Sequence, residues 1–199
     1  MIAKNEEAVL ARCLESVQGV FDHIVIVDTG STDKTRSIAQ KYADIVADYR
    51  WQNDFAAARN FSFSLSTADY IMWLDADDML LPADRDALLS LKARLDGSVD
   101  AYMLLYRMGE ENGALVYCRE RIVKRACGFL WSGAVHEAIC VYGNIEHADI
   151  AVTHKKPQGR AAGCRNLCIF AKQFSLGTTP EERQKFYFAR ELFSNGLYD

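Results

Sequence analysis

The sequence has neither a long apolar run nor a surplus of positive charge. No stretch approaches the roughly 20 consecutive apolar residues that cross a bilayer. Met1 is followed almost at once by the charged segment 4–7, so we expect no signal peptide. The formal net charge is −4 at pH 7 and there is no basic stripe, which argues against nucleic acid as a partner.

Metal-binding cysteine motifs are also absent. The cysteines form no CxxC pair, so the spacing typical of a zinc site is missing. We expect all of them to be reduced and mostly buried, as small hydrophobic side chains of a cytoplasmic protein. They are Cys13, Cys118, Cys127, Cys140, Cys164 and Cys168.

What remains is the composition of an ordinary globular chain. Half of its 199 residues are hydrophobic and a quarter are charged, and the length is sufficient for a sizeable core. We expect one α/β domain over residues 1–156 and a helical extension over residues 157–199. The aromatic-rich stretch 186–192 of this extension is typical of the start of a helical repeat.

Apolar strands alternate with helical segments over the first 78 residues, which predicts a βαβ-type sheet. Residues 1–3 are short for a first strand. Further strands are expected at 23–27, 45–47 and 70–74, and helices at 6–18, from about 33 to 42, and at 54–64.

The pattern changes in the second half. A helix over 83–95 follows Pro82, which suits the first turn of a helix. Two strands and a hairpin turn at 110–113 come next. The remaining predicted elements are the strands 101–108, 114–124 and 150–153 and the helices 133–140, 164–176 and 180–197.

Three carboxylates follow the apolar run 70–74 directly, in the sequence Trp73-Leu74-Asp75-Ala76-Asp77-Asp78. A buried strand that ends in acid places negative charge at its carboxyl end, where open α/β sheets bind ligands. Crowded carboxylates repel each other unless a cation lies among them, so the motif favours a divalent metal. The alternative is a polar loop in which Asp77 or Asp78 caps a helix.

Asp28 ends the strand 23–27 as Asp75 ends the strand 70–74. In one parallel sheet the two ends lie at the same edge, so both acids would face one crevice. A carboxylate at Asp28 could accept hydrogen bonds from a ligand. An equally good interpretation is that Asp28 only begins the turn that follows it.

Three other residues could carry chemistry. Arg59 leaves an alanine-rich helix face, and its guanidinium suits a phosphate or a nucleobase edge. Glu137 lies near aromatic residues, where burial would favour a general base. His154 follows a strand and could bind a metal. Each has a simpler interpretation as a solvated or structural side chain.

Taken together, these segments resemble a glycosyltransferase of family 2 with the GT-A fold. The resemblance covers most of residues 1–155, and it also extends to bacterial enzymes in which the domain precedes tetratricopeptide-type helices. It rests on the order of five motifs, namely Lys4-Asn5-Glu6-Glu7, Val27-Asp28-Thr29-Gly30-Ser31-Thr32-Asp33, Ala58-Arg59-Asn60, Trp73-Leu74-Asp75-Ala76-Asp77-Asp78 and Gly133-Ala134-Val135-His136-Glu137.

The resemblance implies a fold and a set of roles. The fold would be a mostly parallel mixed sheet flanked by helices, with a C-terminal helical tail. Glu137 would be the catalytic base, in a His-Glu pair where the family more commonly has two acids. Asp77 and His154 would bind Mn²⁺ or Mg²⁺. The nucleotide-sugar, most commonly UDP-linked in such enzymes, would be bound by Asn5, Glu6, Asp28, Arg59 and Asp75.

The implied reaction is inverting transfer of the sugar to an acceptor hydroxyl. The acceptor could be a sugar, a lipid-linked sugar or a peptide in cell-envelope polysaccharide biosynthesis. The resemblance is compatible with a homodimer and with peripheral association at the inner face of the membrane. Two alternatives stay open: a nucleotidyltransferase or phosphotransferase that uses the same acids, and a non-catalytic module that binds a nucleotide-sugar.

Overall fold

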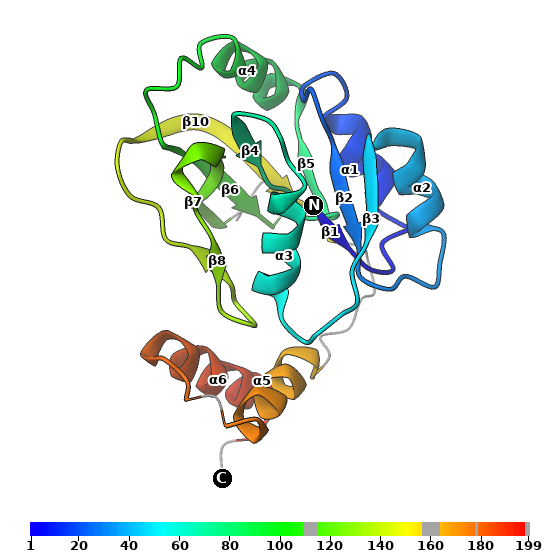
Figure 1. Cartoon of the computed structure of the whole chain (residues 1–199), viewed down its shortest axis with the longest axis vertical. Coiled ribbons are helices and arrows are strands. Elements are labelled where there is room, and N and C mark those ends of the chain that lie inside the picture. The colour runs from blue at the N-terminus through cyan, green and yellow to red at the C-terminus, as the bar shows by residue number, and fades with distance from the viewer. Residues whose placement is uncertain (110–114, 157–163, 178, 198–199) are drawn as a thin grey trace.

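The computed structural model describes residues 1–109, 115–156, 164–177 and 179–197 (Figure 1). Within this part, a parallel three-stranded sheet and a mixed five-stranded sheet lie next to each other, with helices on their faces. A pair of helices near the C-terminus lies apart from both sheets, below α3 in Figure 1. The predicted α/β architecture with a mixed sheet and flanking helices is confirmed.

The smaller sheet follows the predicted alternation of strands and helices. Its strands pair in parallel in the order in which they occur along the chain. Ile26 is fully buried because Leu10 and Ala39, from the two connecting helices, pack against the sheet around it. The elements are β1 (Ile2–Ala3), α1 (Leu10–Ser16), β2 (Val25–Asp28), α2 (Thr35–Tyr42) and β3 (Ile45–Asp48).

The larger sheet has the order β4-β7-β6-β10-β5. β6 and β10 are parallel, and the other pairs are antiparallel. Leu104 on the central strand β6 and Val152 on the adjacent strand β10 are fully buried in the largest apolar cluster. The strands are β4 (Tyr70–Met72), β5 (Asp78–Leu80), β6 (Ala101–Met108), β7 (Leu115–Lys124) and β10 (Ile145–His154).

Two further helices pack against these sheets, α3 next to β2 and α4 next to β10. α3 (Phe55–Ser64) begins at Asp54, whose side chain caps the helix by accepting a hydrogen bond of 2.9 Å from the Ala57 N–H. Its buried face is made of small residues and Arg59. α4 (Pro82–Lys92) begins with its proline, as predicted.

The segment after β7 differs from its prediction. The predicted helix over 133–140 is wrong, because Gly133 and His136 have φ angles of 93° and 53°, which an α-helix does not contain. The chain instead forms the short hairpin strands β8 (Trp131–Ser132) and β9 (Ala138–Ile139), which are paired antiparallel. A one-turn 3₁₀ helix at Arg125–Cys127 precedes them.

Other helix and strand boundaries also differ from their predictions. α1 starts later than the predicted helix 6–18, since Asn5 has a φ of 54° and the Glu6 carbonyl accepts the N–H groups of Val9 and Leu10 in a turn. Strand β4 ends at Met72 rather than at residue 74. The short strand β5 was not predicted. The predicted hairpin turn at 110–113 lies outside the described residues.

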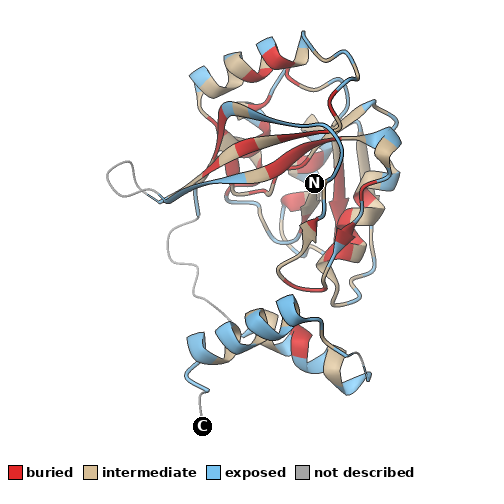
Figure 2. Cartoon of the chain, turned by 90° about the vertical axis from the view of Figure 1, so that its left-hand side faces the viewer, coloured by how far each residue is buried: buried red, intermediate tan, exposed pale blue. Residues whose placement is uncertain are grey.

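The helices near the C-terminus are α5 (Arg165–Ser175) and α6 (Glu182–Ser194). They pack against each other and against the start of α3 and the segment after β8, through an apolar cluster that includes Phe170 and Val135. Figure 2 shows that most of their surface is exposed. No helix in the described ranges combines the length and the hydropathy that a membrane span requires.

The prediction of mostly buried cysteines is wrong. All six thiols are free, but Cys13 is the buried one and Cys127 is half-buried, while the other four are exposed. Cys118 lies on the solvent-exposed half of β7, and Cys164 and Cys168 lie at the exposed start of α5. Burial, together with the nearby Asp78 and Asp75, raises the pKa of Cys13 to about 12.

We therefore expect two classes of thiol. At pH 8 a water-soluble disulfide reagent should modify the exposed Cys118, Cys140, Cys164 and Cys168 in the folded protein, and Cys13 only after denaturation, since thiolates are the reactive species. Mass spectrometry of labelled peptides identifies each site. Rapid labelling of Cys13 in the folded protein would contradict the burial described above.

Candidate active site

The acidic motif forms a loop between β4 and β5. The Asp75 N–H donates to Asp78 Oδ2 over 3.0 Å, and the Asp78 N–H donates to the Asp75 carbonyl over 3.0 Å. The Trp73 N–H still reaches the Arg121 carbonyl, at 3.2 Å, although β4 has already ended. Asp78 thus closes the loop and also begins β5, and it caps no helix.

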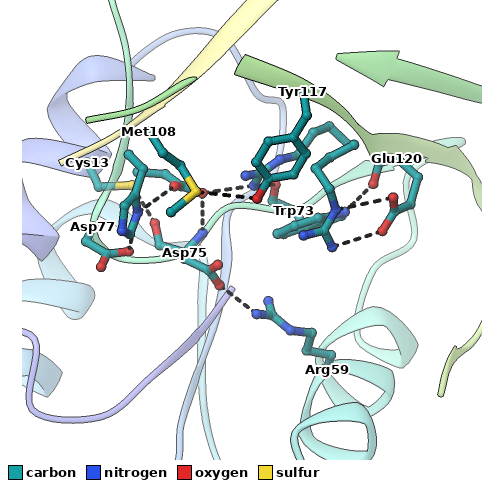
Figure 3. Close-up of polar contacts among 12 residues, drawn as sticks. Cys13, Arg59, Trp73, Asp75, Asp77, Met108, Tyr117 and Glu120 are labelled. Atoms are coloured by element: carbon teal, nitrogen blue, oxygen red, sulfur yellow. Dashed lines mark hydrogen bonds and ion pairs between the residues drawn. The ribbon is translucent and has the colours of Figure 1, made fainter. Parts of the chain in front are cut away.

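Arg59 binds two acids from different parts of the chain. Its Nη2 lies 2.7 Å from Asp75 Oδ1, and its Nε lies 2.7 Å from Glu137 Oε1. The guanidinium also lies over the rings of Trp73 and Trp131. Figure 3 shows Arg59 reaching from α3 towards Asp75. A solvated arginine, the simpler interpretation of the sequence, is therefore wrong.

The charges of this cluster stabilise one another. Burial by itself would lower the pKa of Arg59, but Asp75 and Glu137 raise it above its ordinary value. Burial would likewise raise the pKa of Asp75, but Arg59 and Arg121 keep it below its ordinary value. Both groups are therefore charged in the folded protein.

A second buried arginine lies behind the acidic loop. Arg121 Nη1 is 2.9 Å from Asp78 Oδ2, and both side chains are completely buried. Nη1 also donates to the Trp73 carbonyl over 3.2 Å, and the guanidinium lies between the rings of Trp73 and Tyr106. Arg121 was not among the residues predicted from the sequence, and Asp78 was predicted only as a member of the acidic motif, without a role of its own. The signal that could have pointed to Arg121 is its position in β7, where a charged residue directly precedes the apolar pair Ile122-Val123.

Asp77, Asp78 and His154 form a compact cluster. β10 pairs with β5 in a register that places His154 opposite Asp78. One ligand atom from each of the three residues lies within 4.8 Å of the others. The two carboxylates raise the pKa of His154 to about 9, against the effect of burial. The contacts of His154 Nδ1, 3.4 Å to Asp77 and 3.6 Å to Asp78, are longer than a normal N–H···O bond, so the attraction is mainly electrostatic.

This cluster fits a divalent cation. His154 Nδ1 and Asp78 Oδ1 are buried and form no hydrogen bond within the described structure. Buried polar atoms are rarely left unpaired, and an ion is one of the partners that resolves them. Carboxylate oxygens with one imidazole nitrogen suit Mn²⁺, and the carboxylates suit Mg²⁺. Asp77 is the more exposed of the two carboxylates, so it faces the open side of the cluster.

The remaining predicted residues meet in a pair of neighbouring loops. The Asp28 carboxylate accepts hydrogen bonds from the N–H of Gly30, at 3.2 Å, and from the N–H and hydroxyl of Ser31. The Asn5 N–H donates to the Ser31 hydroxyl, and Asn5 Oδ1 accepts the N–H of Thr32 at 2.8 Å. The Glu6 N–H donates to the hydroxyl of Thr35 at 2.7 Å. These contacts join the loops after β1 and β2.

The structure thus brings the predicted residues together in three groups. Arg59, Asp75 and Glu137 form one, Asp77 and His154 a second, and Asn5, Glu6 and Asp28 a third. The hydrogen bond from the Asp75 N–H to Asp78 Oδ2 links the first group to Asp78, which lies against His154 of the second. The assumption that Asp28 and Asp75 end strands of one parallel sheet is wrong, because β2 and β4 belong to different sheets and Asp75 lies beyond the end of β4.

A cavity of about 650 Å³ lies elsewhere, between β2, β4 and α4. Its lining is largely apolar and includes Val20, Ile24, Met72 and Leu88, but none of the predicted site residues. The lining also includes charged side chains such as Asp22 and Lys92, but the ligand atoms that could hold a cation converge at the acidic loop. We therefore place the candidate site at the acidic loop.

Comparison with known proteins identifies the family. Residues 1–129 match the model of glycosyl transferase family 2. Over the whole chain, the sequence is 32% identical to the lipopolysaccharide core biosynthesis glycosyltransferase LpsC of Rhizobium meliloti, 81% of whose length is covered. The chain belongs to glycosyl transferase family 2.

Other relatives of this family 2 chain are longer. A TPR repeat-containing protein of Synechococcus elongatus is 31% identical over 140 residues, which are 70% of this chain and 34% of that protein. The glycosyltransferase SunS of the SPbeta prophage of Bacillus subtilis is 29% identical over 69% of this chain and 33% of its own length. The chain therefore matches only about a third of the length of these two relatives.

Solved structures confirm the GT-A fold. Staphylococcus aureus TarS in complex with UDP-GlcNAc has a TM-score of 0.63 at 16% identity, over 97% of this chain and 71% of TarS. Glucosyl-3-phosphoglycerate synthase of Mycobacterium tuberculosis, in complex with Mn²⁺, UDP and glucosyl-3-phosphoglycerate, has a TM-score of 0.58 at 15% identity, over 91% of this chain and 79% of that protein. At such low identity these matches establish the fold alone.

The buried ion pair under the acidic loop predicts a large effect on stability. We expect Arg121→Ala to lower the free energy of unfolding by about 3–5 kcal/mol, because it leaves Asp78 charged and unpaired in the core. The matched control is Arg36→Ala, whose ion pair with Asp48 is exposed and should contribute at most about 1 kcal/mol. Urea unfolding measures both. Equal effects of the two substitutions would contradict this account of the ion pair.

Proposed function

We propose that this chain is a metal-dependent, inverting glycosyltransferase that transfers a sugar from a UDP-sugar to an acceptor hydroxyl. The observation that carries the proposal is the convergence of Asp77, Asp78 and His154 beside the Arg59–Asp75 ion pair in a family 2 domain. Two similar structures support the donor: TarS holds UDP-GlcNAc, and glucosyl-3-phosphoglycerate synthase holds UDP with Mn²⁺. The catalytic domain would span residues 1–156, with residues 157–199 as a helical extension.

In this proposal the nucleotide lies against the loops after β1 and β2. Asp28 binds the uracil through carboxylate lone pairs that its hydrogen bonds to Gly30 and Ser31 leave available. Asn5 and Glu6 shape the same surface, because their backbone and side-chain contacts fix the two loops relative to each other. Arg59 and Asp75 complete the nucleotide site from the side of α3.

Asp77 and His154, with Asp78 beneath them, would hold Mn²⁺ or Mg²⁺. When bound, the ion neutralises the negative charge that develops on the departing diphosphate. The chain contributes an acidic cluster that is already assembled, since Arg121 compensates the buried charge of Asp78. Arg59 similarly keeps Asp75 ionised.

Glu137 is proposed as the base. The contact between Arg59 and Glu137 Oε1 orients the Glu137 carboxylate. Lone pairs of this carboxylate remain available, so it can accept the proton of the acceptor hydroxyl as the new bond forms. Attack assisted by one base on the face opposite the leaving group inverts the anomeric centre. No protein nucleophile is needed for this route. By analogy with LpsC, a sugar hydroxyl of an envelope glycan is the proposed acceptor.

The metal role predicts a change in nucleotide affinity. In calorimetric titrations Mn²⁺ should tighten UDP binding to the wild-type protein. Asp77→Asn should lower the UDP affinity measured with Mn²⁺ at least about tenfold, because it weakens metal binding. Asp86→Asn, on the exposed surface of α4, is the matched control. Equal UDP affinity with and without Mn²⁺ in the wild-type protein would refute the metal dependence.

The base role predicts a loss of turnover without a loss of binding. Glu137→Gln keeps an oxygen for Arg59 but cannot take a proton, so the rate of UDP release should fall about 10²–10⁴-fold while UDP affinity is retained. Glu146→Gln, an exposed substitution, should leave the rate unchanged. Full activity of Glu137→Gln would exclude Glu137 as the base. UDP binding without UDP release by the wild-type protein would leave a binding module as the better interpretation, and release of pyrophosphate instead of UDP would indicate a nucleotidyltransferase.

A further inference from the structure

The segment that carries Glu137 has an unfavourable backbone conformation. We define the base loop as residues 133–137. His136 has a φ of 53°, in the left-handed region that non-glycine residues avoid, and Gly133 has a φ of 93°. Residues other than glycine seldom adopt the backbone conformation of His136 unless surrounding contacts impose it. The contacts that hold the base loop therefore bear on where Glu137 points.

These contacts come largely from α6. The His136 ring stacks on Tyr187 with ring centres 4.2 Å apart and planes 14° from parallel. Its Nε2 lies 2.8 Å from Glu191 Oε1, and its carbonyl accepts a hydrogen bond of 3.2 Å from Arg183 Nη2. Arg183, Tyr187 and Glu191 are four residues apart, so they form one stripe along the helix.

α5 and α3 support the same arrangement. The Asn166 amide of α5 donates to Glu191 Oε1 over 2.9 Å, which orients the carboxylate that meets His136. Ala134 and Val135 pack in the apolar cluster that contains Phe170 of α5. The Phe55 N–H, at the start of α3, donates to the Ala134 carbonyl over 2.9 Å. The base loop is thus held between the helix pair on one side and the start of α3 on the other.

Glu137 follows the clamped residue directly. Its carboxylate reaches Arg59, which in turn binds Asp75 in the acidic loop. The direction of the Glu137 side chain depends on the backbone of His136, because one peptide unit separates the two residues. Contacts made by α6 therefore extend, through one residue, to the ion-pair cluster of the site.

We propose that α6 is a positioning element of the active site: Tyr187 and Glu191 hold His136 in its left-handed conformation and so aim Glu137 at Arg59 and the acceptor. The proposal rests on the role proposed for Glu137. It assigns His136, Tyr187 and Glu191 as positioning residues rather than catalytic ones. It also gives the C-terminal helices a part in turnover and none in nucleotide binding.

The test compares Glu191→Ala with Glu191→Gln in the full chain. Glu191→Gln keeps an oxygen for His136, and Glu182→Ala, at an exposed position on α6, is the matched control. We expect Glu191→Ala to speed amide hydrogen exchange in residues 133–139 several-fold while residues 25–48 are unchanged. The NMR signal of the Arg59 Nε–H should shift towards its position in Glu137→Gln.

Activity is read as UDP release from UDP-N-acetylglucosamine and UDP-glucose with Mn²⁺. For Glu191→Ala we expect kcat to fall on the order of tenfold to a hundredfold with the donor KM and UDP affinity unchanged, since a misplaced catalytic group slows chemistry alone. Glu191→Gln should recover most of the rate. Tyr187→Ala and Tyr187→Phe form a second pair, in which we expect kcat to fall for Tyr187→Ala and to be largely retained for Tyr187→Phe.

The outcomes separate this inference from the proposed function. Unchanged exchange in the base loop of Glu191→Ala, or a changed loop with an unchanged kcat, would overturn the positioning role. If the wild-type chain binds no UDP and releases none from either donor, the proposed function fails instead. In that case the exchange rates and the Arg59 signal still decide whether α6 holds Glu137 in place.

Discussion

The site depends on the neutralisation of acids that the fold forces together. Asp75 and Asp78 lie three residues apart in a tight loop, and each is paired with a buried arginine from another element. Arg59 comes from α3 and Arg121 from β7, and both guanidinium groups lie over the ring of Trp73. Without these cations the loop would carry neighbouring negative charges, that of Asp78 fully buried, and desolvation together with repulsion would oppose its folding.

This constraint explains why Asp77 differs from its neighbours. Asp75 and Asp78 have arginine partners, whereas the contact that Asp77 makes is with His154, at 3.4 Å. A cation has most to contribute where negative charge is least compensated. His154 Nδ1 and Asp78 Oδ1, which form no hydrogen bond within the described structure, lie 3.6 Å apart at the same place. The arginines support the loop, and the Asp77 side leaves room for a metal.

The chain reaches this arrangement through several distant segments. The register of β10 against β5 sets His154 opposite Asp78, and Glu137 lies in the loop that joins the paired strands β8 and β9. The helix pair near the C-terminus then contacts His136, the residue before Glu137. Residues from the beginning of α3 to α6 therefore share one network, although the family match itself covers residues 1–129.

The sequence alone determined the elements whose cause is local. The apolar run at β2, the alanine-rich helix over 54–64 and the ordered motifs of family 2 were all predicted without a structure. The helix predicted over 133–140 failed because its composition is compatible with a helix, while the positive φ of His136 is imposed by Tyr187 and Glu191, about 50 residues away. Tertiary structure also decided the partners of Arg59, the burial of Arg121 and the placement of β2 and β4 in different sheets. Ion pairs and strand register join residues far apart in the chain, so no local pattern records them.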